Sequence, residues 1–127
     1  WQADINSGPI VVVQIEHINA VDNLKEILSV KGVDAFIIGP YDLSGSIGKA
    51  GDFNNEKLTK LLKKYEKISK KMNKSMGFHV IEPNHKLLLE KINKGYSIIA
   101  FSFDAYLLGT KLNEELKNYS DFSKNDI

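Results

Sequence analysis

The segment AFIIGPYDLS, residues 35–44, constrains the fold of this chain more than any other. Its apolar run stops at Gly39–Pro40, and the carboxylate of Asp42 follows shortly after. Runs that are apolar on both faces are typical of strands in a parallel sheet covered by helices. Ligands of such sheets gather beyond the carboxyl ends of the strands. Glycine lets the backbone approach a ligand closely, and proline cannot continue a strand. The segment therefore predicts that Asp42 faces a binding site.

A second segment of the same form lies one unit earlier. Residues 10–15 form another buried-strand pattern, which ends at Glu16. If the two strands are parallel neighbours, Glu16 and Asp42 emerge at the same edge of the sheet. Two carboxylates there make an oxygen-rich pocket suited to Mg²⁺ or Mn²⁺, with water and substrate completing the octahedron. The same acidic residues can instead cap the helices that follow their strands. Spacing alone leaves both interpretations open.

The rest of the chain continues an alternation of strand and helix patterns. Further strands are expected at 76–81 and 97–103. Helices are expected from Asn19 as N-cap to Gly32, over 54–73, from Pro83 as first helical residue to Gly95, and over 105–117. The expected apolar helix faces are Leu58, Leu61, Leu62, Tyr65, Ile68 and Met72, and then Leu87, Leu88 and Ile92. Four βα units in a row predict an α/β fold.

The remaining segments are expected to connect or flank these units. Residues 1–9 are interpreted as a connector and 119–127 as a polar tail, within one domain that spans 1–127. The glycines of 45–51 do not fit the P-loop pattern, so we expect a mobile loop beside the site. The seven lysines between Lys60 and Lys74 form either a solvated outer face or a basic docking patch, and charged outer faces are the commoner case.

Composition excludes several functions. The net charge is +1, and all 17 basic residues are lysine, so neither a nucleic-acid partner nor bidentate phosphate binding is indicated. The absence of cysteine excludes disulfides and thiolate sites in this portion, and it fits a cytoplasmic protein. No apolar run approaches the length of a membrane span, so no membrane association is expected. None of the lysines falls within a predicted strand, which leaves no good candidate for a Schiff base.

The strand-end motifs resemble the HpcH/HpaI family of metal-dependent (class II) 2-oxo-acid aldolases, which includes the 4-hydroxy-2-oxoheptanedioate and 2-dehydro-3-deoxyglucarate aldolases. The resemblance rests on Val13–Glu16 and Gly32–Ser44, continues through Gly77–Pro83 and Gly95–Phe101, and extends from about Val11 to Leu112. A (β/α)₈ barrel has about 250 residues, and the four earlier βα units of the family's barrel have no counterpart here. The resemblance therefore implies the C-terminal half of a TIM barrel.

The resemblance also implies a site. Glu16 and Asp42 correspond to the family's acidic ligands for Mg²⁺ or Mn²⁺, with Co²⁺ as another possible metal. The metal would bind the carboxylate and keto oxygens of pyruvate and polarise them as a Lewis acid. The backbone N–H groups of Tyr41 and Asp42 would hold the pyruvate carboxylate. The expected substrate-binding segment is Gly39, Pro40, Tyr41, Asp42, Leu43 and Ser44.

Catalytic residues are harder to assign. His79 and Glu82 lie at the end of a predicted strand and face the same pocket if the sheet is parallel. His79 is then a candidate proton shuttle or aldehyde-binding group, although a buried, hydrogen-bonded histidine is an equal alternative. His17 either orients Glu16 or begins a loop, and His85 is expected on the surface. The family's histidine base and the arginine that contacts the keto oxygen belong to the missing N-terminal half.

Three functions follow as hypotheses. The first is a divalent-metal-dependent aldolase that reversibly cleaves a 4-hydroxy-2-oxo acid to pyruvate and an aldehyde. The second is a CoA-ester lyase of the citrate or malyl type. The third is a non-catalytic half-barrel that serves as an association module. The resemblance further implies a homo-oligomer in which the C-terminal helix packs against a neighbouring subunit, and we expect the half-barrel alone to be inactive.

Overall fold

The computed structural model describes residues 8–125, with side chains up to 119, so most of the predicted connector lies outside the described residues. A single sheet organises the molecule. Its strands are β1 (Val12–Ile15), β2 (Ala35–Ile38), β3 (Ser75–Val80) and β4 (Ile98–Phe101), in that spatial order. All three neighbouring pairs are parallel. The predicted α/β fold with four parallel βα units is confirmed, and β4 is shorter than expected.

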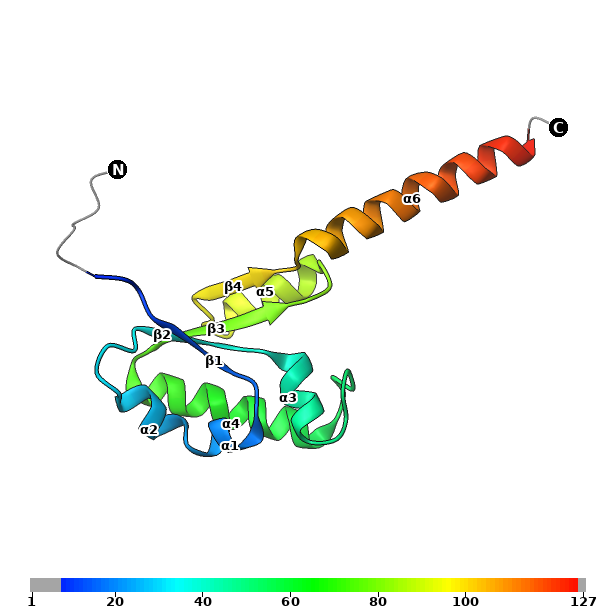
Figure 1. Ribbon diagram of the computed structural model, residues 1–127. Helices are drawn as coiled ribbons and strands as arrows, with labels where there is room; N and C mark the ends of the chain where they lie inside the picture. Colours follow the sequence, from blue (N-terminus) through cyan, green and yellow to red (C-terminus); the bar gives the residue numbers. More distant parts are fainter. Residues whose placement is uncertain (1–7, 126–127) are drawn as a thin grey trace.

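The helices connect successive strands. They are α1 (Ile18–Asp22), α2 (Leu24–Ser29), α3 (Pro40–Ser46), α4 (Glu56–Met72), α5 (His85–Asn93) and α6 (Asp104–Asn125). Figure 1 shows α1, α2 and α4 beneath one face of the sheet, while α6 projects away from the body. The other face of β1 and β2 carries no helix of the described chain. This one-sided cover places the core between the sheet and α1, α2 and α4.

The core is apolar and centred on aromatic residues. Its fully buried members include Ile15, Phe36, Ile38, Leu24, Leu58 and Tyr65. The rings of Phe36 and Tyr65 meet edge to face with centroids 5.0 Å apart. The Tyr65 hydroxyl donates a 2.8 Å hydrogen bond to the backbone oxygen of Gly77, so α4 is anchored to β3 by a polar contact inside an apolar layer. A buried hydroxyl that finds such a partner fixes the position of its helix.

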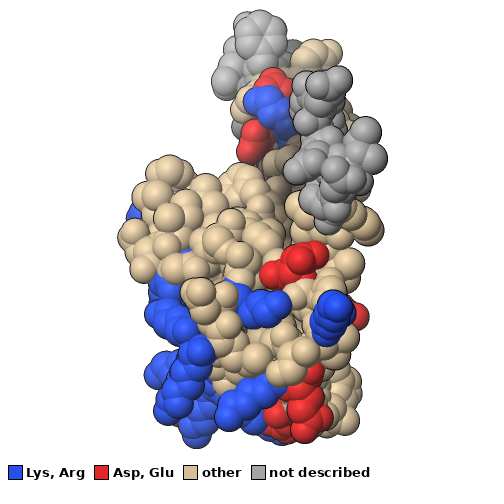
Figure 2. All heavy atoms as spheres, turned by 90° about the vertical axis from the view of Figure 1, so that its left-hand side faces the viewer, with Lys and Arg blue, Asp and Glu red and all other residues tan. Residues whose placement is uncertain are grey.

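Helix α4 forms as its sequence predicts. The side chain of Asn55 accepts a hydrogen bond from the backbone N–H of Lys57, which caps the first turn. Asn73 ends the helix in the left-handed conformation, with φ of 49°. The expected apolar face is confirmed, because Leu58, Leu61, Tyr65 and Ile68 are buried and Leu62 and Met72 pack against the core. The lysines on α4 between 60 and 71 are exposed, and lysines gather on the lower part of the face in Figure 2.

Three helix predictions are wrong in detail. The first helix divides into α1 and α2, and its N-cap is His17 rather than Asn19, because His17 Nδ1 accepts the Asn19 N–H at 3.2 Å. Helix α5 begins after Asn84, whose side chain accepts the Leu87 N–H at 3.1 Å, so Pro83 is not its first residue. Helix α6 continues to Asn125 instead of ending at Lys117, and it therefore includes most of the predicted polar tail.

Helix α3 is an element that the sequence did not predict. It begins at Pro40 immediately after β2 and includes Gly45 and Ser46, which were expected in a loop. The buried Ser44 hydroxyl donates to the Tyr41 carbonyl at 2.6 Å and accepts from the Gly51 N–H at 2.9 Å. These two bonds tie the helix to the segment that follows it. Segment 47–55 connects α3 to α4 through turns and carries the remaining glycines.

Candidate active site

Glu16 and Gly39 meet where β1 and β2 end. The two strands are in register, with Ile15 opposite Ile38, and the Gly39 N–H donates to the Ile15 carbonyl at 3.1 Å. A Cβ atom at Gly39 would lie only 3.4 Å from Glu16 Oε2 and 3.2 Å from Gln14 Nε2. Glycine is therefore the residue that lets the Glu16 carboxylate lie against the end of β2.

Gln14 holds the Glu16 carboxylate in place. Its Nε2 donates a 2.8 Å hydrogen bond to Glu16 Oε2 across the same face of β1, since residues two apart on a strand share a face. Sequence reasoning did not single out Gln14. The available signal was its polarity inside an otherwise apolar strand, two residues before the acid.

Asp42 stands in the first turn of α3. That helix has Gly39 at its N-cap, so Asp42 is not a capping residue, and Glu16 is not one either because His17 caps α1. Within the described residues the Asp42 carboxylate has no hydrogen bond or ion pair. Its position still places a negative charge at the positive end of the helix dipole. Neither acid is thus an N-cap residue, although Asp42 does have the favourable helix-start position that the alternative interpretation allows.

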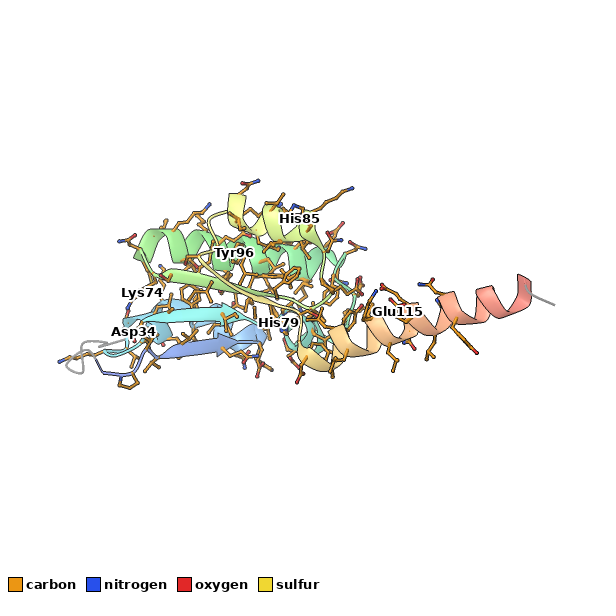
Figure 3. The ribbon with its side chains drawn as sticks, turned by 90° about the horizontal axis from the view of Figure 1, so that it is seen from above. Asp34, Lys74, His79, His85, Tyr96 and Glu115 are labelled. Carbon is orange, nitrogen blue, oxygen red and sulfur yellow. The ribbon has the colours of Figure 1, made fainter. Side chains whose placement is uncertain are left out.

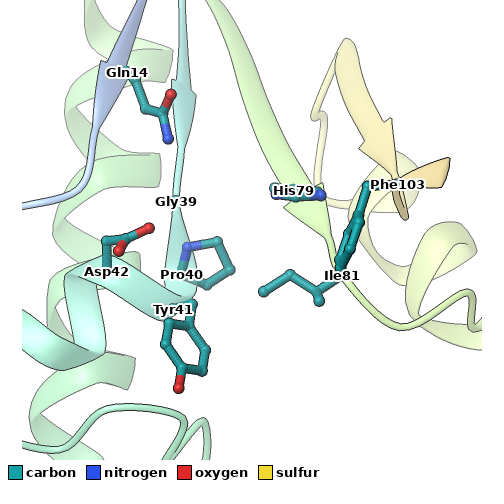
Figure 4. A pocket seen from close by; sticks show the side chains of 8 residues that line it. All are labelled: Gln14, Gly39, Pro40, Tyr41, Asp42, His79, Ile81 and Phe103. Carbon is teal, nitrogen blue, oxygen red and sulfur yellow. The ribbon is translucent and has the colours of Figure 1, made fainter. Parts of the chain in front are cut away.

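A cavity of about 310 Å³ opens beside these groups at the carboxyl edge of the sheet. Figure 4 shows Asp42 and Pro40 on one side of it and His79, Ile81 and Phe103 on the other. Its lining is Gln14, Gly39, Pro40, Tyr41, Asp42, His79, Ile81 and Phe103. Of the predicted substrate-binding segment, Gly39 to Asp42 line the cavity. Leu43 and Ser44 face the interior and are fully buried.

The predicted catalytic candidates take different positions. His79 lines the cavity, and its Nε2 lies 3.3 Å from the backbone oxygen of Ser102. Glu82 is exposed and does not line this cavity, although it borders a larger one of about 620 Å³ between α4 and α5. His17 caps α1 through its Nδ1, and the printed hydrogen bond to the Glu16 carboxylate comes from Gln14 instead. His85 is exposed on α5, well away from His79 (Figure 3).

The donor set fits a hard divalent cation. Two carboxylates at neighbouring strand ends supply oxygen ligands of the type that Mg²⁺ and Mn²⁺ prefer, and such ions commonly keep several water ligands. Among the described residues, no group of three or more His, Cys, Asp or Glu side chains gathers in one place. Asp42 lines the cavity and Glu16 lies beside it against Gly39, so these two would be the protein ligands of such an ion, with water and substrate in the other positions.

Fold and site together define a class of protein: a parallel α/β half-barrel with a cavity lined by Asp42 at the carboxyl edge of its strands. The chain belongs to the HpcH/HpaI aldolase/citrate lyase family, whose model matches residues 5–109. Membership confirms the resemblance inferred from the motifs. It also supports a lyase as the broad class of activity.

Individual relatives agree with this assignment. A 2-keto-3-deoxy-L-rhamnonate aldolase of Escherichia coli O6:K15:H31 (strain 536 / UPEC) is 28% identical over 116 residues, which are 91% of this chain and 43% of the relative. The crystal structure of the HpcH/HpaI aldolase from Desulfitobacterium hafniense DCB-2 superposes with a TM-score of 0.80 and 28% identity, over 87% of this chain and 42% of that one. The citrate synthase SbnG shares the fold, with a TM-score of 0.81 at 17% identity, over 91% and 46% of the two chains.

These comparisons also bear on the extent of the chain. It spans less than half the length of the curated relatives that it matches. The four-stranded sheet is accordingly half of a barrel. No helix within residues 8–125 is long and apolar enough to cross a membrane.

Proposed function

We propose that this chain supplies the metal-binding half of a divalent-metal-dependent aldolase, which reversibly cleaves a 4-hydroxy-2-oxo acid to pyruvate and an aldehyde. The observation that carries the proposal is that Asp42 lines the cavity together with Gly39, while Glu16, at the end of the neighbouring strand, lies against Gly39. Family membership and the aldolases among the relatives support the reaction class. The C-terminal location of this half within the barrel is part of the proposal.

In this proposal, two residues bind the metal and two others position the Glu16 carboxylate. Glu16 and Asp42 hold Mg²⁺ or Mn²⁺, or another divalent ion such as Co²⁺. When bound, the metal supplies Lewis-acid polarisation of the 2-oxo acid. Gln14 keeps the Glu16 carboxylate turned toward Gly39 through its 2.8 Å hydrogen bond. Gly39 leaves room for that carboxylate, because any side chain there would meet Glu16 and Gln14.

The first turn of α3 binds the substrate carboxylate. Pro40 is the first helical residue and has no N–H to donate, whereas the N–H groups of Tyr41 and Asp42 follow it at the helix start. N–H groups of a first turn have no partner within their helix and suit an anion. We therefore assign the pyruvate carboxylate to these two N–H groups, with Pro40 and Tyr41 forming the adjacent wall of the cavity.

The remaining catalytic groups are proposed to come from the complementary half-barrel. Cleavage of a 4-hydroxy-2-oxo acid requires a base for the 4-hydroxyl proton and a donor to the keto oxygen. This chain has no arginine, so it cannot supply the guanidinium that the family uses as that donor. The two halves together complete one site, in a homo-oligomer in which α6 packs against a neighbouring subunit.

The metal assignment predicts the effect of two substitutions. In the complete protein, Glu16→Gln and Asp42→Asn should each weaken Mn²⁺ binding by about 10- to 100-fold or more, because changes outside the ligand shell already have effects of that size. Isothermal titration calorimetry measures the affinity, and circular dichroism checks that the fold is kept. Glu26→Gln is the matched control, since Glu26 is exposed on α2 and lines neither cavity. Unchanged affinity in both site variants would show that the assignment is wrong.

A CoA-ester lyase is the second candidate. It is favoured by the family's description, which includes citrate lyase, and by the larger cavity that shares Pro40, Tyr41, His79 and Ile81 with the first. Pyruvate release from 4-hydroxy-2-oxo acids, compared with cleavage of hydroxyacyl-CoA thioesters by the same preparation, separates the two. Turnover of neither class of substrate by the complete protein would favour a non-catalytic association module.

A further inference from the structure

Lys91 is a buried cation that the proposed aldolase reaction does not use. It lies in the last turn of α5, and only 6% of its side chain is exposed. Within the described residues its ammonium donates no hydrogen bond, and the closest carboxylate oxygen, Glu90 Oε1, lies 3.9 Å away. That oxygen accepts a 2.6 Å hydrogen bond from Lys94 instead. Buried polar groups ordinarily have hydrogen-bond partners, and an ammonium has three donors to satisfy.

Aromatic rings are the principal neighbours of this ammonium. Its Nζ lies 4.0 Å from the centroid of the Phe78 ring and 5.6 Å from that of Tyr96. The face of an aromatic ring attracts a cation, but the attraction replaces only part of the hydration that the ammonium loses on burial. An anion beside Lys91 would supply both a counter-charge and the acceptor oxygens that the chain does not provide.

Lys91 lines the larger cavity, of about 620 Å³, between α4 and α5. This volume is in the range of small-molecule binding sites, about 300–1,000 Å³. The cavity is distinct from the candidate active site, because Gln14, Gly39 and Asp42 do not line it. One part of its wall is apolar and consists of Phe53, Leu58, Leu62, Phe78, Ile81 and Leu87. The cavity therefore combines an apolar wall with one buried cation.

The other charges of the wall are already paired or hydrated. The half-buried carboxylate of Glu66 accepts a 2.9 Å hydrogen bond from the Tyr96 hydroxyl, and Glu90 is paired with Lys94. Among the charged residues that line the cavity, Lys91 alone is buried. The exposed members of that set are Lys63, Glu82, Glu90 and Lys94. Lys91 is thus the group of this wall that gains most from a bound anion.

We propose that the cavity between α4 and α5 binds a monocarboxylate with an apolar body. Its carboxylate accepts hydrogen bonds from the Lys91 ammonium, and its apolar part lies against Leu58, Leu62 and Leu87. Hydrogen bonds between an ammonium and a carboxylate are charge-assisted and strong. A small inorganic anion would leave the apolar wall uncovered, and a neutral apolar molecule would leave Lys91 unpaired. The proposal does not rest on the aldolase reaction, and the ligand is not its 2-oxo acid.

Three probes separate the contributions of head and body. Isothermal titration calorimetry of the complete protein measures the affinity for octanoate, for 1-octanol and for acetate. Octanoate should bind about 10-fold or more tightly than 1-octanol, the value of a hydrogen bond to a charged group. It should bind at least about 100-fold more tightly than acetate, which lacks six of its methylene groups. Octanoate affinity no higher than that of acetate or of 1-octanol would overturn the proposal.

Three variants locate the bound molecule. Lys91→Met keeps the apolar stem and removes the ammonium, so the ratio of octanoate to 1-octanol affinity should fall to about 1. Lys86→Met, an exposed lysine of α5 outside the cavity, is the matched control and should keep the ratio. Thr59→Trp places a ring in the cavity from α4 and should weaken binding of both molecules about 10-fold or more.

The two kinds of variant check each other. Retained 1-octanol binding in Lys91→Met shows that the cavity is intact, so that a loss of octanoate affinity alone reports the ammonium. An unchanged affinity ratio in Lys91→Met, or octanoate binding that Thr59→Trp leaves unaltered, would overturn the assignment to this cavity. None of these measurements depends on turnover. Their failure leaves the proposed aldolase function standing, and an inactive protein that binds octanoate as described would leave this inference standing.

Discussion

Lys91 departs from the pattern that its helix predicts. The inward face of α5 was expected to be Leu87, Leu88 and Ile92, yet Ile92 is 50% exposed and Lys91 only 5%. The Lys91 ammonium lies 4.0 Å from the centroid of the Phe78 ring and 5.6 Å from that of Tyr96. Long lysine stems pack well on apolar surfaces, and an ammonium is attracted to an aromatic face. The prediction for Ile92 is wrong because the aromatic residues of β3 set which side of α5 is buried.

Burial of Lys91 predicts a dependence of stability on pH. Desolvation lowers the pKa of Lys91 below its ordinary value of 10.5, because the charged form loses water. Below the folded-state pKa both states are charged and folding carries the full cost of burying the charge. As pH rises through that pKa the cost disappears. The free energy of unfolding of the wild type, relative to Lys91→Met, should therefore rise as the pH increases through the lowered pKa toward 10.5.

Urea denaturation at several pH values measures this difference in the complete protein. Lys111→Met is the control, because Lys111 pairs with Glu115 on the exposed surface of α6 and its pKa is raised rather than lowered. The contribution of the Lys111 ion pair to stability is lost only when the pH rises above 10.5. A wild-type curve parallel to that of Lys91→Met over this window would show that the buried ammonium has no such cost.

At the scale of elements, the pairing of β2 with β3 depends on the absence of a side chain at Gly77. Gly77 is opposite Ile37, and a Cβ atom there would lie 2.9 Å from the Ile37 Cβ and 3.0 Å from its Cα. Both strands are central in the sheet, so neither can move aside without disturbing a second neighbour. The Gly77 carbonyl also receives the Tyr65 hydroxyl, which fixes its distance from α4.

Gly77→Ala should destabilise the protein by about 1–3 kcal/mol, the usual cost of forcing atoms into a packed site. Gly109→Ala is the matched control, because a Cβ there meets nothing within 4 Å and alanine is the better helix former. The midpoint of urea denaturation should fall for the first variant and stay constant or rise for the second. Equal stability of Gly77→Ala and wild type would mean that Ile37 moves freely to accommodate the methyl group.

At the scale of the whole molecule, apolar surface is left uncovered at both edges of the sheet and along α6. Ile10 is 80% exposed beside β1, and Phe101 is 43% exposed on β4. Helix α6 projects from the body (Figure 1) and exposes Leu108, Leu112 and Leu116 by 71, 61 and 56%. Open strand edges and contiguous apolar surface of this kind promote association. We therefore expect this half-barrel to associate through these surfaces.

We predict that residues 1–127 expressed alone are inactive as an aldolase and are either aggregated or oligomeric. Adding a complementary N-terminal half-barrel, fused or in trans, should cover the sheet edges and restore metal-dependent pyruvate release. Sedimentation velocity of the isolated chain, followed by the same measurement after addition of the other half, gives the direct test. A monodisperse, well-folded monomer with full turnover would contradict the requirement for a second half.

The sequence by itself determined the βα order, the parallel sheet and the two acids. Mostly apolar runs that end at Glu16 and Gly39–Pro40 mark buried strands, and parallel strands bring their carboxyl ends to one edge of the sheet. Helix α4 was equally predictable, since its apolar stripe and its Asn55 cap are local signals. These features depend on residues close together in the chain.

Only the tertiary structure decided the features that join distant segments. The sequence does not indicate that Ser102 takes a left-handed conformation, nor that its carbonyl meets the His79 ring. The burial of Lys91 instead of Ile92 follows from the rings of Phe78 in β3 and Tyr96 just before β4, which α5 must cover. Such contacts depend on how each helix packs on the sheet. The free energy of that packing is a sum over many residues that are far apart in the sequence.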